Sequence, residues 1–180
     1  MKIIQTNIEG LLIIEPAVFG DSRGYFFESY NESDYEKAGI RVKFIQDNES
    51  LSQKNVLRGL HLQLPPYGQA KLVRVNQGAV LDVAVDVRKN SPTYGKYFAA
   101  ELNAANKRMM FIPEGFAHGF LTLEDNTIFI YKCSHFYNKA SEACISWNDP
   151  AIGIEWNIKD PVLSQKDMNG ILLKDFKPVS

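Results

Sequence analysis

The segment Lys71–Arg88, which reads KLVRVNQGAVLDVAVDVR, constrains the fold more than any other part of the chain. Valine occupies every second position from Val73 to Val75 and again, beyond an Asn-Gln-Gly turn, from Val83 to Val87. A period of two is typical of strands that bury one face, because successive side chains of a strand point to opposite sides. The segment therefore predicts two β-strands separated by a turn.

Similar short runs, separated by glycine, proline, asparagine and aspartate, occur along the whole chain. They are Ile3–Ile14, Tyr25–Tyr30, Arg41–Gln46, Tyr97–Leu102, Arg108–Ile112, Thr127–Tyr137 and Ala143–Trp147. Many short strands with turns between them indicate a sandwich or a barrel. We expect a mainly β fold, an antiparallel barrel or jelly roll with a few helical turns.

Two short helices are also expected. The first covers Ser33–Ala38, where a serine and a glutamate three residues apart have the spacing of a capping box and Gly39 supplies the C-terminal stop. The second follows Ser164, with Asp167 three residues later and Gly170 as the breaker.

Length and charge limit the classes of protein to which the chain can belong. Its 180 residues predict a single domain, 1–180. Its 20 basic and 21 acidic residues lack the basic excess of a nucleic-acid binder. Leu11–Ile14 is the longest apolar run near the N-terminus, too short for a secretion signal or a membrane span. With only Cys133 and Cys144, we expect a reduced, soluble, cytoplasmic protein without nucleic-acid or membrane partners.

Polar residues on the buried faces of such a barrel are candidates for function. His61 and Gln63 share a strand face in RGLHLQ, and His118 follows a turn in PEGFAHGF. A third group alternates along one face and comprises Tyr131, Cys133, His135 and Tyr137. A lone histidine in a β core is more often a hydrogen-bonded structural group, and tyrosine is common on strands. Lys71 favours a function, because burying an ammonium is costly, although a lysine at a strand end can also reach solvent.

The strings His-x-Gln and Pro-x-Gly-x-x-His resemble the two halves of the cupin signature, in which three histidines and a glutamate bind a metal ion. His61 and His118 match the first and last ligands, whereas Gln63 replaces a histidine and Lys71 replaces the glutamate. An ammonium repels a cation and an amide is a poor ligand for transition metals. We therefore expect no metal, and a site that stabilises negative charge.

A longer series of motifs extends this resemblance from Asp21 to Asp167. The motifs are DSRGYFFE, FIQDN, VLRGLHLQ, QAKLVRVNQGAVLDVAVDVR, SPTYGKY, IPEGFAHGF, the pair Tyr131 and Tyr137 with Glu142, SWNDPAIGIEW and LSQKD. In this order they resemble the dTDP-4-dehydrorhamnose 3,5-epimerase family, cupin-type epimerases of sugar nucleotides. The resemblance implies a cupin-like double-stranded β-helix, that is, a jelly-roll barrel. It also implies cofactor-independent epimerisation of a dTDP-4-keto-6-deoxy sugar at C3 and C5, in dTDP-L-rhamnose biosynthesis.

The resemblance assigns a role to each catalytic candidate. His61 would be the base that removes a proton beside the ketone, with Asp167 fixing its tautomer. Lys71 would stabilise the enolate, and Tyr131 would return a proton from the opposite face. From the residues alone, the carboxylate that pairs with His61 stays open, because Asp82 and Asp86 also lie on a strand.

The resemblance also implies how the substrate is bound. Arg23, Arg58 and Lys166 would meet the diphosphate, since cationic side chains suit phosphate oxygens, and Tyr137 would stack on the thymine. The remaining expected contacts are Glu28, Gln46, Asp47, Asn48, His118 and Glu142. The family commonly forms homodimers that share an N-terminal strand, so Arg23 and Glu28 would serve the partner's site.

Some points depart from this scheme or leave alternatives open. Leu62 stands where many members carry an aromatic residue, and Arg58 shares a face with His61 only if the strand bulges near Gly59. His135 and Cys133 replace commoner residues and receive no role. The alternative functions are a related monoepimerase or ketoisomerase, a metal-dependent cupin, and a sugar-binding module without catalysis.

Overall fold

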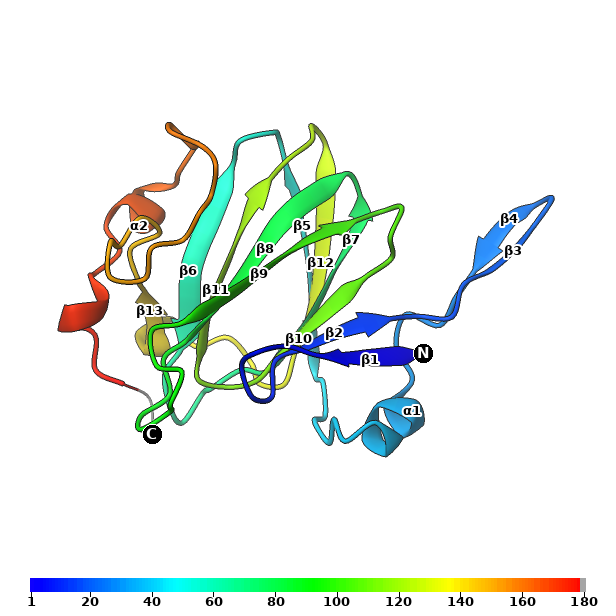
Figure 1. The fold of residues 1–180 in the computed structure, drawn as a ribbon, viewed down its shortest axis with the longest axis horizontal. Helices are drawn as coiled ribbons and strands as arrows, with labels where there is room; N and C mark the ends of the chain where they lie inside the picture. The colour runs from blue at the N-terminus through cyan, green and yellow to red at the C-terminus, as the bar shows by residue number, and fades with distance from the viewer. Residues whose placement is uncertain (179–180) are drawn as a thin grey trace.

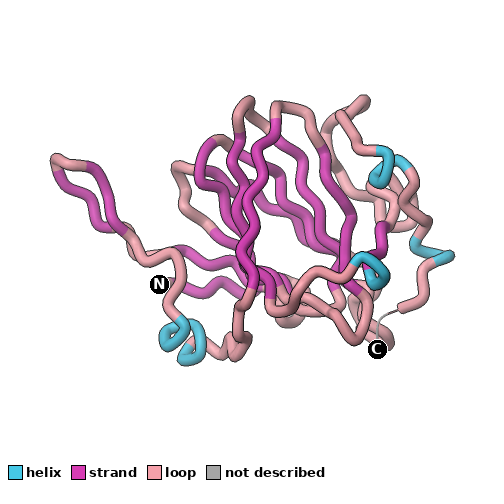
Figure 2. Tube along the Cα trace, turned by 180° about the vertical axis from the view of Figure 1, so that it is seen from behind, coloured by secondary structure: helices cyan, strands magenta, loops and turns pink. Residues whose placement is uncertain are grey.

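The computed structural model describes residues 1–178, which form two antiparallel sheets that face one another (Figures 1 and 2). The six-stranded sheet has the order β1 (Lys2–Gln5), β2 (Leu12–Glu15), β10 (Met109–Ile112), β7 (Lys71–Gln77), β12 (Thr127–Cys133) and β5 (Gln46–Ser52). The five-stranded sheet has the order β13 (Glu142–Cys144), β6 (Leu57–Gln63), β11 (Phe116–Thr122), β8 (Ala79–Asp86) and β9 (Tyr97–Asn103). The predicted mainly β, cupin-like jelly-roll barrel is confirmed.

The segment Lys71–Arg88 contributes to both sheets. Its first half is β7 in the six-stranded sheet and its second half is β8 in the five-stranded sheet. Gly78, with φ +76°, carries the chain between them, and an added Cβ there would collide with Oγ1 of Thr127. The predicted alternation therefore builds two opposite walls of the barrel.

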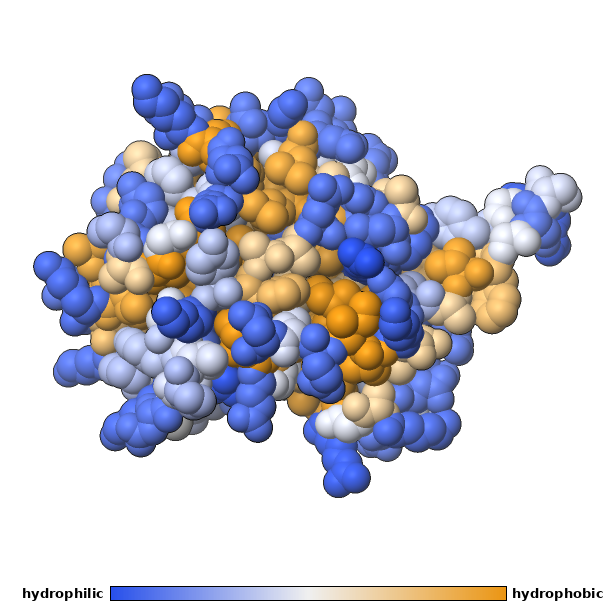
Figure 3. Space-filling view, viewed as in Figure 1, coloured by the Kyte–Doolittle hydropathy of each residue, from blue (hydrophilic) through white to orange (hydrophobic). Residues whose placement is uncertain are grey.

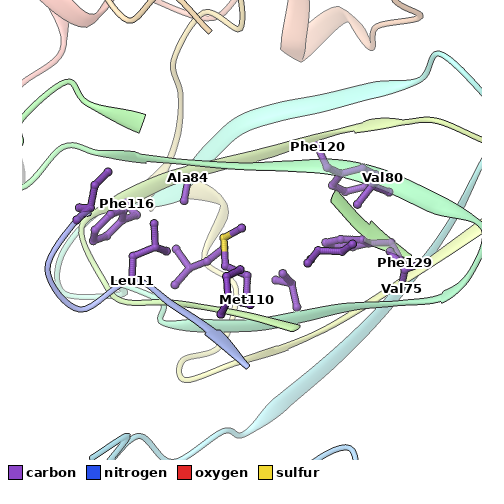
Figure 4. Packing of buried hydrophobic residues seen from close by; sticks show 13 residues of the cluster. Leu11, Val75, Val80, Ala84, Met110, Phe116, Phe120 and Phe129 are labelled. Atoms are coloured by element: carbon purple, nitrogen blue, oxygen red, sulfur yellow. The ribbon is translucent and has the colours of Figure 1, made fainter. Parts of the chain in front are cut away.

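The main core lies between the two sheets. Val75, Met110 and Phe129 from one sheet face Val80 and Phe120 from the other, and the rings of the two phenylalanines stack with centroids 4.2 Å apart (Figure 4). Burying apolar surface of this kind stabilises the fold by about 25 cal/mol per Å². The core fills one part of the barrel and leaves the other part for polar side chains.

Both expected helices are present. Helix α1 spans Glu32–Lys37, but Asn31 precedes it as N-cap and Ser33 lies inside the helix, so the predicted capping box is wrong. Gly39 ends the helix with φ +89°, as expected. Helix α2 (Gln165–Met168) has the predicted capping box between Ser164 and Asp167. Two 3₁₀ turns, η1 (Lys139–Ser141) and η2 (Leu173–Asp175), complete the helical part.

Several predicted strands have different bounds. The run Ile3–Ile14 divides into β1 and β2, and Thr127–Tyr137 is a strand only as far as Cys133. The strand predicted at Arg41–Gln46 is wrong, because Val42 and Phe44 pack as an irregular segment against the cluster that covers the outer face of the six-stranded sheet. The strand at this place is β5, which begins at Gln46.

Strands β3 (Phe19–Asp21) and β4 (Gly24–Phe26) form a hairpin that projects away from the barrel, which we call the arm (Figure 1). It carries exposed aromatic side chains: Phe19, Tyr25 and Phe26 are each 60–66% exposed. Apolar surface is visible where the arm leaves the body (Figure 3). In residues 1–178, no helix is long and apolar enough to cross a membrane.

Candidate active site

A cavity of about 450 Å³ opens between the two sheets. All four predicted catalytic residues line it: His61, Lys71, Tyr131 and Asp167. Of the ten predicted binding residues, seven line it as well: Gln46, Asn48, Arg58, His118, Tyr137, Glu142 and Lys166. The barrel thus brings together side chains from β5, β6, β7, β11, β12, β13 and α2.

His61 on β6 pairs with Asp167 on α2, with Nε2 of the histidine 2.6 Å from Oδ1 of the carboxylate. The same Oδ1 accepts the backbone N–H of Gly59 at 3.1 Å, and Oδ2 accepts the hydroxyl of Ser164 at 2.6 Å. Burial alone would raise the pKa of Asp167, but the contacts with His61, Ser164 and Gly59 lower it to about 2. The carboxylate is therefore charged at neutral pH and holds one ring nitrogen of His61.

The bulge that the sequence required is present in β6. Between the register pairs His61–His118 and Arg58–Phe120, β6 contains one residue more than β11. Gly59 at the bulge has φ +127°, and an added Cβ would lie 2.6 Å from Cα of Gly119. The bulge puts Arg58 and His61 on the same cavity and frees the N–H of Gly59 for Asp167.

The two other candidate carboxylates have different partners. Both oxygens of Asp82 lie 3.0–3.1 Å from Nε2 of His118, with both residues buried. Burial lowers the pKa of His118, although Asp82 opposes this. Asp86 accepts hydrogen bonds from Arg88, and from Ser91 and Thr93 in the turn after β8. The partner of His61 in the structure is Asp167.

Lys71 and Tyr131 approach the cavity from the six-stranded sheet, opposite the wall that carries His61. Lys71 is only 9% exposed, and burial lowers the pKa of its ammonium, with Cys133, Asp82 and Glu142 acting in the other direction. Burial raises the pKa of Tyr131, so its hydroxyl keeps its proton at neutral pH. The amine of Lys71 and the protonated hydroxyl of Tyr131 therefore face the histidine across the cavity.

Polar and cationic side chains surround the mouth of the cavity. Lys166 donates to Glu142 at 2.9 Å, and the hydroxyl of Tyr137 donates to the other oxygen of Glu142 at 3.4 Å. Nε of Arg58 donates to Ser52 at 3.1 Å. Two cations at one rim suit an anionic ligand, and the guanidinium is the group best shaped for phosphate.

Three predicted binding residues lie outside this chain's cavity. Asp47 points away from it and pairs with Lys132 at 2.9 Å. Arg23 is on the arm, where it pairs with Asp21. Glu28 follows the arm and accepts a hydrogen bond from Asn31.

Several residues that line the cavity were not predicted as site residues from the sequence, namely Ser50, Gln69, Phe120, Phe129 and Ser164. The signal for Ser50 is the period of two that it shares with Gln46 and Asn48 on β5. His135, which alternation predicts on the same face as Tyr131, lies beyond the end of β12 and packs edge-on against Tyr67.

One group of side chains has the arrangement of potential metal ligands. His61, Cys144 and Asp167 each offer one ligand atom, and these atoms lie within 4.8 Å of one another. Burial, followed by the charge of Asp167, raises the pKa of Cys144 to about 11. A thiol that stays protonated is a poor ligand, because metals bind the thiolate. His61 and Asp167 already meet directly at 2.6 Å, so their own pairing accounts for the closeness of two of these three groups.

Comparison with known proteins gives consistent matches over nearly the whole chain. A family model described as dTDP-4-dehydrorhamnose 3,5-epimerase matches residues 5–175. The dTDP-4-dehydrorhamnose 3,5-epimerase of Shigella flexneri is 56% identical over 171 residues, 94% of each chain. The crystal structure of a dTDP-6-deoxy-D-glucose-3,5-epimerase from Legionella pneumophila Philadelphia 1, in complex with dTDP-4-keto-L-rhamnose, has a TM-score of 0.95 at 46% identity and covers 99% of this chain and 98% of its own. ChmJ, a 3'-monoepimerase from Streptomyces bikiniensis solved with dTDP-quinovose, has a TM-score of 0.88 at 34% identity, covering 94% and 86%.

Proposed function

This chain belongs to the dTDP-4-dehydrorhamnose 3,5-epimerase family, and we propose that it inverts C3 and C5 of dTDP-4-dehydro-6-deoxy-D-glucose to give dTDP-4-dehydro-L-rhamnose, without a cofactor, in dTDP-L-rhamnose biosynthesis. The proposal rests above all on the His61–Asp167 pair, which faces Lys71 and Tyr131 across one cavity. These four groups supply a base, its orienting carboxylate, a cation and an acid.

His61 is the base. Asp167 holds its Nε2, so the other ring nitrogen is left to accept the proton from the carbon beside the ketone. The electrons of the broken C–H bond move into an enolate, and the charge on the imidazolium is stabilised by the carboxylate. General acid–base catalysis of this kind contributes about 10²–10⁴-fold.

Lys71 stabilises the enolate oxygen. Its ammonium lies in a buried part of the cavity, where a fixed charge acts more strongly on a developing anion than it would in water. This role also accounts for a lysine at a position where burial is costly.

Tyr131 returns the proton from the opposite face. His61 is on β6 of the five-stranded sheet and Tyr131 is on β12 of the six-stranded sheet, so a sugar ring between them meets the base on one side and the acid on the other. A single base would return the proton to the face from which it came. Two groups on facing walls give inversion, and exchange with solvent then restores both.

The rim binds the nucleotide. Arg58 and Lys166 meet the diphosphate and Tyr137 stacks on the thymine, while Gln46, Asn48, His118 and Glu142 contribute polar contacts. The side chain of Lys166 is 45% exposed, and Arg58 is exposed as well. An incoming diphosphate can therefore reach both cations.

The functional unit is a homodimer, and the chain acts as one domain, 1–180, in the cytoplasm. The exposed aromatic residues of the arm support the dimer, because a projecting apolar hairpin is stabilised when a second copy covers it. Arg23 and Glu28 would then lie at the partner's cavity. The free thiols of Cys133 and Cys144 suit a reducing compartment.

Deuterium incorporation tests the proposed reaction. The keto-sugar nucleotide is incubated with the enzyme in deuterated water, and C3 and C5 are followed by NMR. We expect label at both carbons and loss of labelling with His61→Ala. Label at C3 alone would identify a 3-monoepimerase, the activity by which ChmJ is described. A carbonyl at C3 would identify a ketoisomerase. Label at neither carbon would refute the proposal.

A further inference from the structure

Three glutamine side chains converge on the backbone of one short segment at the cavity mouth. This segment, Ser134–Asn138, follows β12 and carries Tyr137; we call it the mouth loop. Oε1 of Gln46 accepts the N–H of Tyr137 at 3.1 Å, and Oε1 of Gln63 accepts the N–H of Asn138 at 2.9 Å. Nε2 of Gln69 donates to the carbonyl of His135 at 2.7 Å.

The three glutamines come from different parts of the barrel. Gln46 begins β5 of the six-stranded sheet, Gln63 ends β6 of the five-stranded sheet, and Gln69 precedes β7 (Figure 1). The mouth loop is therefore tied to both walls at once. All three side chains also line the cavity.

Further contacts hold these amide groups in place. The nitrogen of Gln46 donates to Asn48 at 3.0 Å, so the amide is fixed at both its oxygen and its nitrogen. Gln63 is 6% exposed, and its oxygen, the atom that could have replaced a metal-binding histidine, is taken by the N–H of Asn138. A buried amide that lost this partner would leave a polar group unsatisfied.

Tyr137 needs such support, because its ring makes little contact with the protein. The residue is 52% exposed, and its hydroxyl makes only a 3.4 Å hydrogen bond, to Glu142. The position of its ring follows from the position of its backbone. A binding group is effective only when its support holds it within about 0.5 Å of the productive geometry.

We propose that Gln46, Gln63 and Gln69 are positioning residues that hold the mouth loop, and thereby place Tyr137 against the base of the bound nucleotide. This rests on the proposed function, in which Tyr137 stacks on thymine. The glutamines act on nucleotide binding, not on the proton transfers between His61 and Tyr131.

The first experiment separates binding from catalysis. Gln63→Met and Gln69→Met keep the length of the side chain and remove its hydrogen bond. We expect each to weaken dTDP binding, measured by calorimetry, about 5- to 30-fold and to raise KM in parallel, with the change in kcat much smaller. Gln53→Met is the matched control, because Gln53 tethers Asn126 in a turn away from the cavity; its dTDP affinity should stay at the wild-type value. Unchanged affinity in folded Gln63→Met and Gln69→Met would overturn the proposal.

We call the three glutamines, with their hydrogen bonds to the mouth loop, the clamp. Amide hydrogen exchange tests the clamp without any ligand. Gln63→Met should accelerate hydrogen exchange of the Asn138 N–H, whereas Gln63→Glu, which keeps an accepting oxygen, should preserve its protection. At position 69 the opposite holds, because a glutamate cannot donate to His135 and should loosen the mouth loop as methionine does. Exchange that is the same in Gln63→Met and the wild type would refute the clamp. If the wild type fails to bind dTDP, the proposed function fails, and the exchange result still decides the clamp.

Discussion

Among single residues, Asp167 links the candidate base to the secondary structure around it. One oxygen meets His61 and the N–H of Gly59, and the other accepts the hydroxyl of Ser164 at the start of α2. The carboxylate thus joins a helix cap to the base of the active site. The charge of Asp167 affects the reaction rate, and its hydrogen bonds at the start of α2 affect the stability of the fold. Substitutions can therefore separate the two effects.

Asp167→Asn is the first test. An amide keeps the size of the side chain and can still accept the N–H of Gly59, but it no longer stabilises the imidazolium. We expect kcat to fall by about 10²–10⁴-fold with the fold retained. Ser164→Ala is the comparison: it removes the cap, costs about 1 kcal/mol of stability and, because the charge of Asp167 stays beside His61, lowers kcat far less than Asp167→Asn does. Similar kcat losses in both variants would show that Asp167 acts only through the helix.

The alkaline limb of the pH profile is the second test. Burial lowers the pKa of Lys71 below its ordinary value of 10.5 and raises that of Tyr131 above its ordinary value of 10.0. If the Lys71 cation is required, kcat/KM falls as pH rises through the lowered pKa of Lys71. In Tyr131→Phe, the residual exchange of substrate protons with solvent should still show this alkaline limb. In Lys71→Met, the limb should be absent and the reaction rate should fall about 10²–10³-fold. A limb that disappears in Tyr131→Phe would assign it to the tyrosine.

The candidate site could be predicted from the sequence only where local pattern carries the information. Alternation around Lys71 and the short motifs around His61 and His118 indicated cavity residues directly. The partner of His61 could not be chosen, because Asp167 belongs to a one-turn helix from a distant part of the chain, and its approach depends on how α2 packs on β6. Residues brought together by packing alone leave no mark on sequence spacing.

At the scale of secondary structure, the shape of the site depends on the bulge in β6. Gly59 combines a positive φ with a close approach to β11, and each of these excludes a side chain for a different reason. Without the bulge, Arg58 and His61 would face opposite sides of the strand.

Gly59→Ala tests the bulge. We expect a loss of about 2–6 kcal/mol in the free energy of unfolding, from backbone strain together with the clash against Gly119, and loss of activity in any protein that folds. Gly24→Ala is the matched control, because Gly24 has φ +133° but no atom within 4 Å of an added Cβ; it should cost only the strain, about 1–3 kcal/mol. Denaturant unfolding measures both, and equal losses would contradict a steric role for the approach to β11.

Strand β5 shows why part of the fold could not be predicted. Its inward-facing residues, Gln46, Asn48 and Ser50, face a polar cavity, so the strand lacks the apolar alternation that identifies β7 and β8. The preceding Val42 and Phe44 do alternate, but they pack against the outer cluster without forming a strand. Polarity thus conceals a strand where the fold builds its binding site.

For the whole molecule, the arm is the feature that a single copy leaves unexplained. It projects from the barrel with its aromatic side chains exposed (Figures 1 and 3). The two predicted binding residues in this region, Arg23 and Glu28, do not line this chain's cavity. A homodimer that exchanges arms would cover the aromatic residues and complete each cavity with a residue of the other copy.

Complementation between two inactive chains tests this exchange. Arg23→Ala and His61→Ala chains carry different tags, are expressed together and are purified as the mixed dimer, whose mass is checked by light scattering. If Arg23 serves the partner's cavity, one of the two sites regains every native residue, and we expect about half the activity of the wild-type dimer. The matched control pairs a wild-type chain with a chain that carries both substitutions: its only intact His61 then meets a defective arm, so activity should stay low. If each arm serves its own chain, the two results exchange places, because the mixed dimer of single variants has no complete site and the control retains one. A chain that purifies only as a monomer would refute the exchange outright.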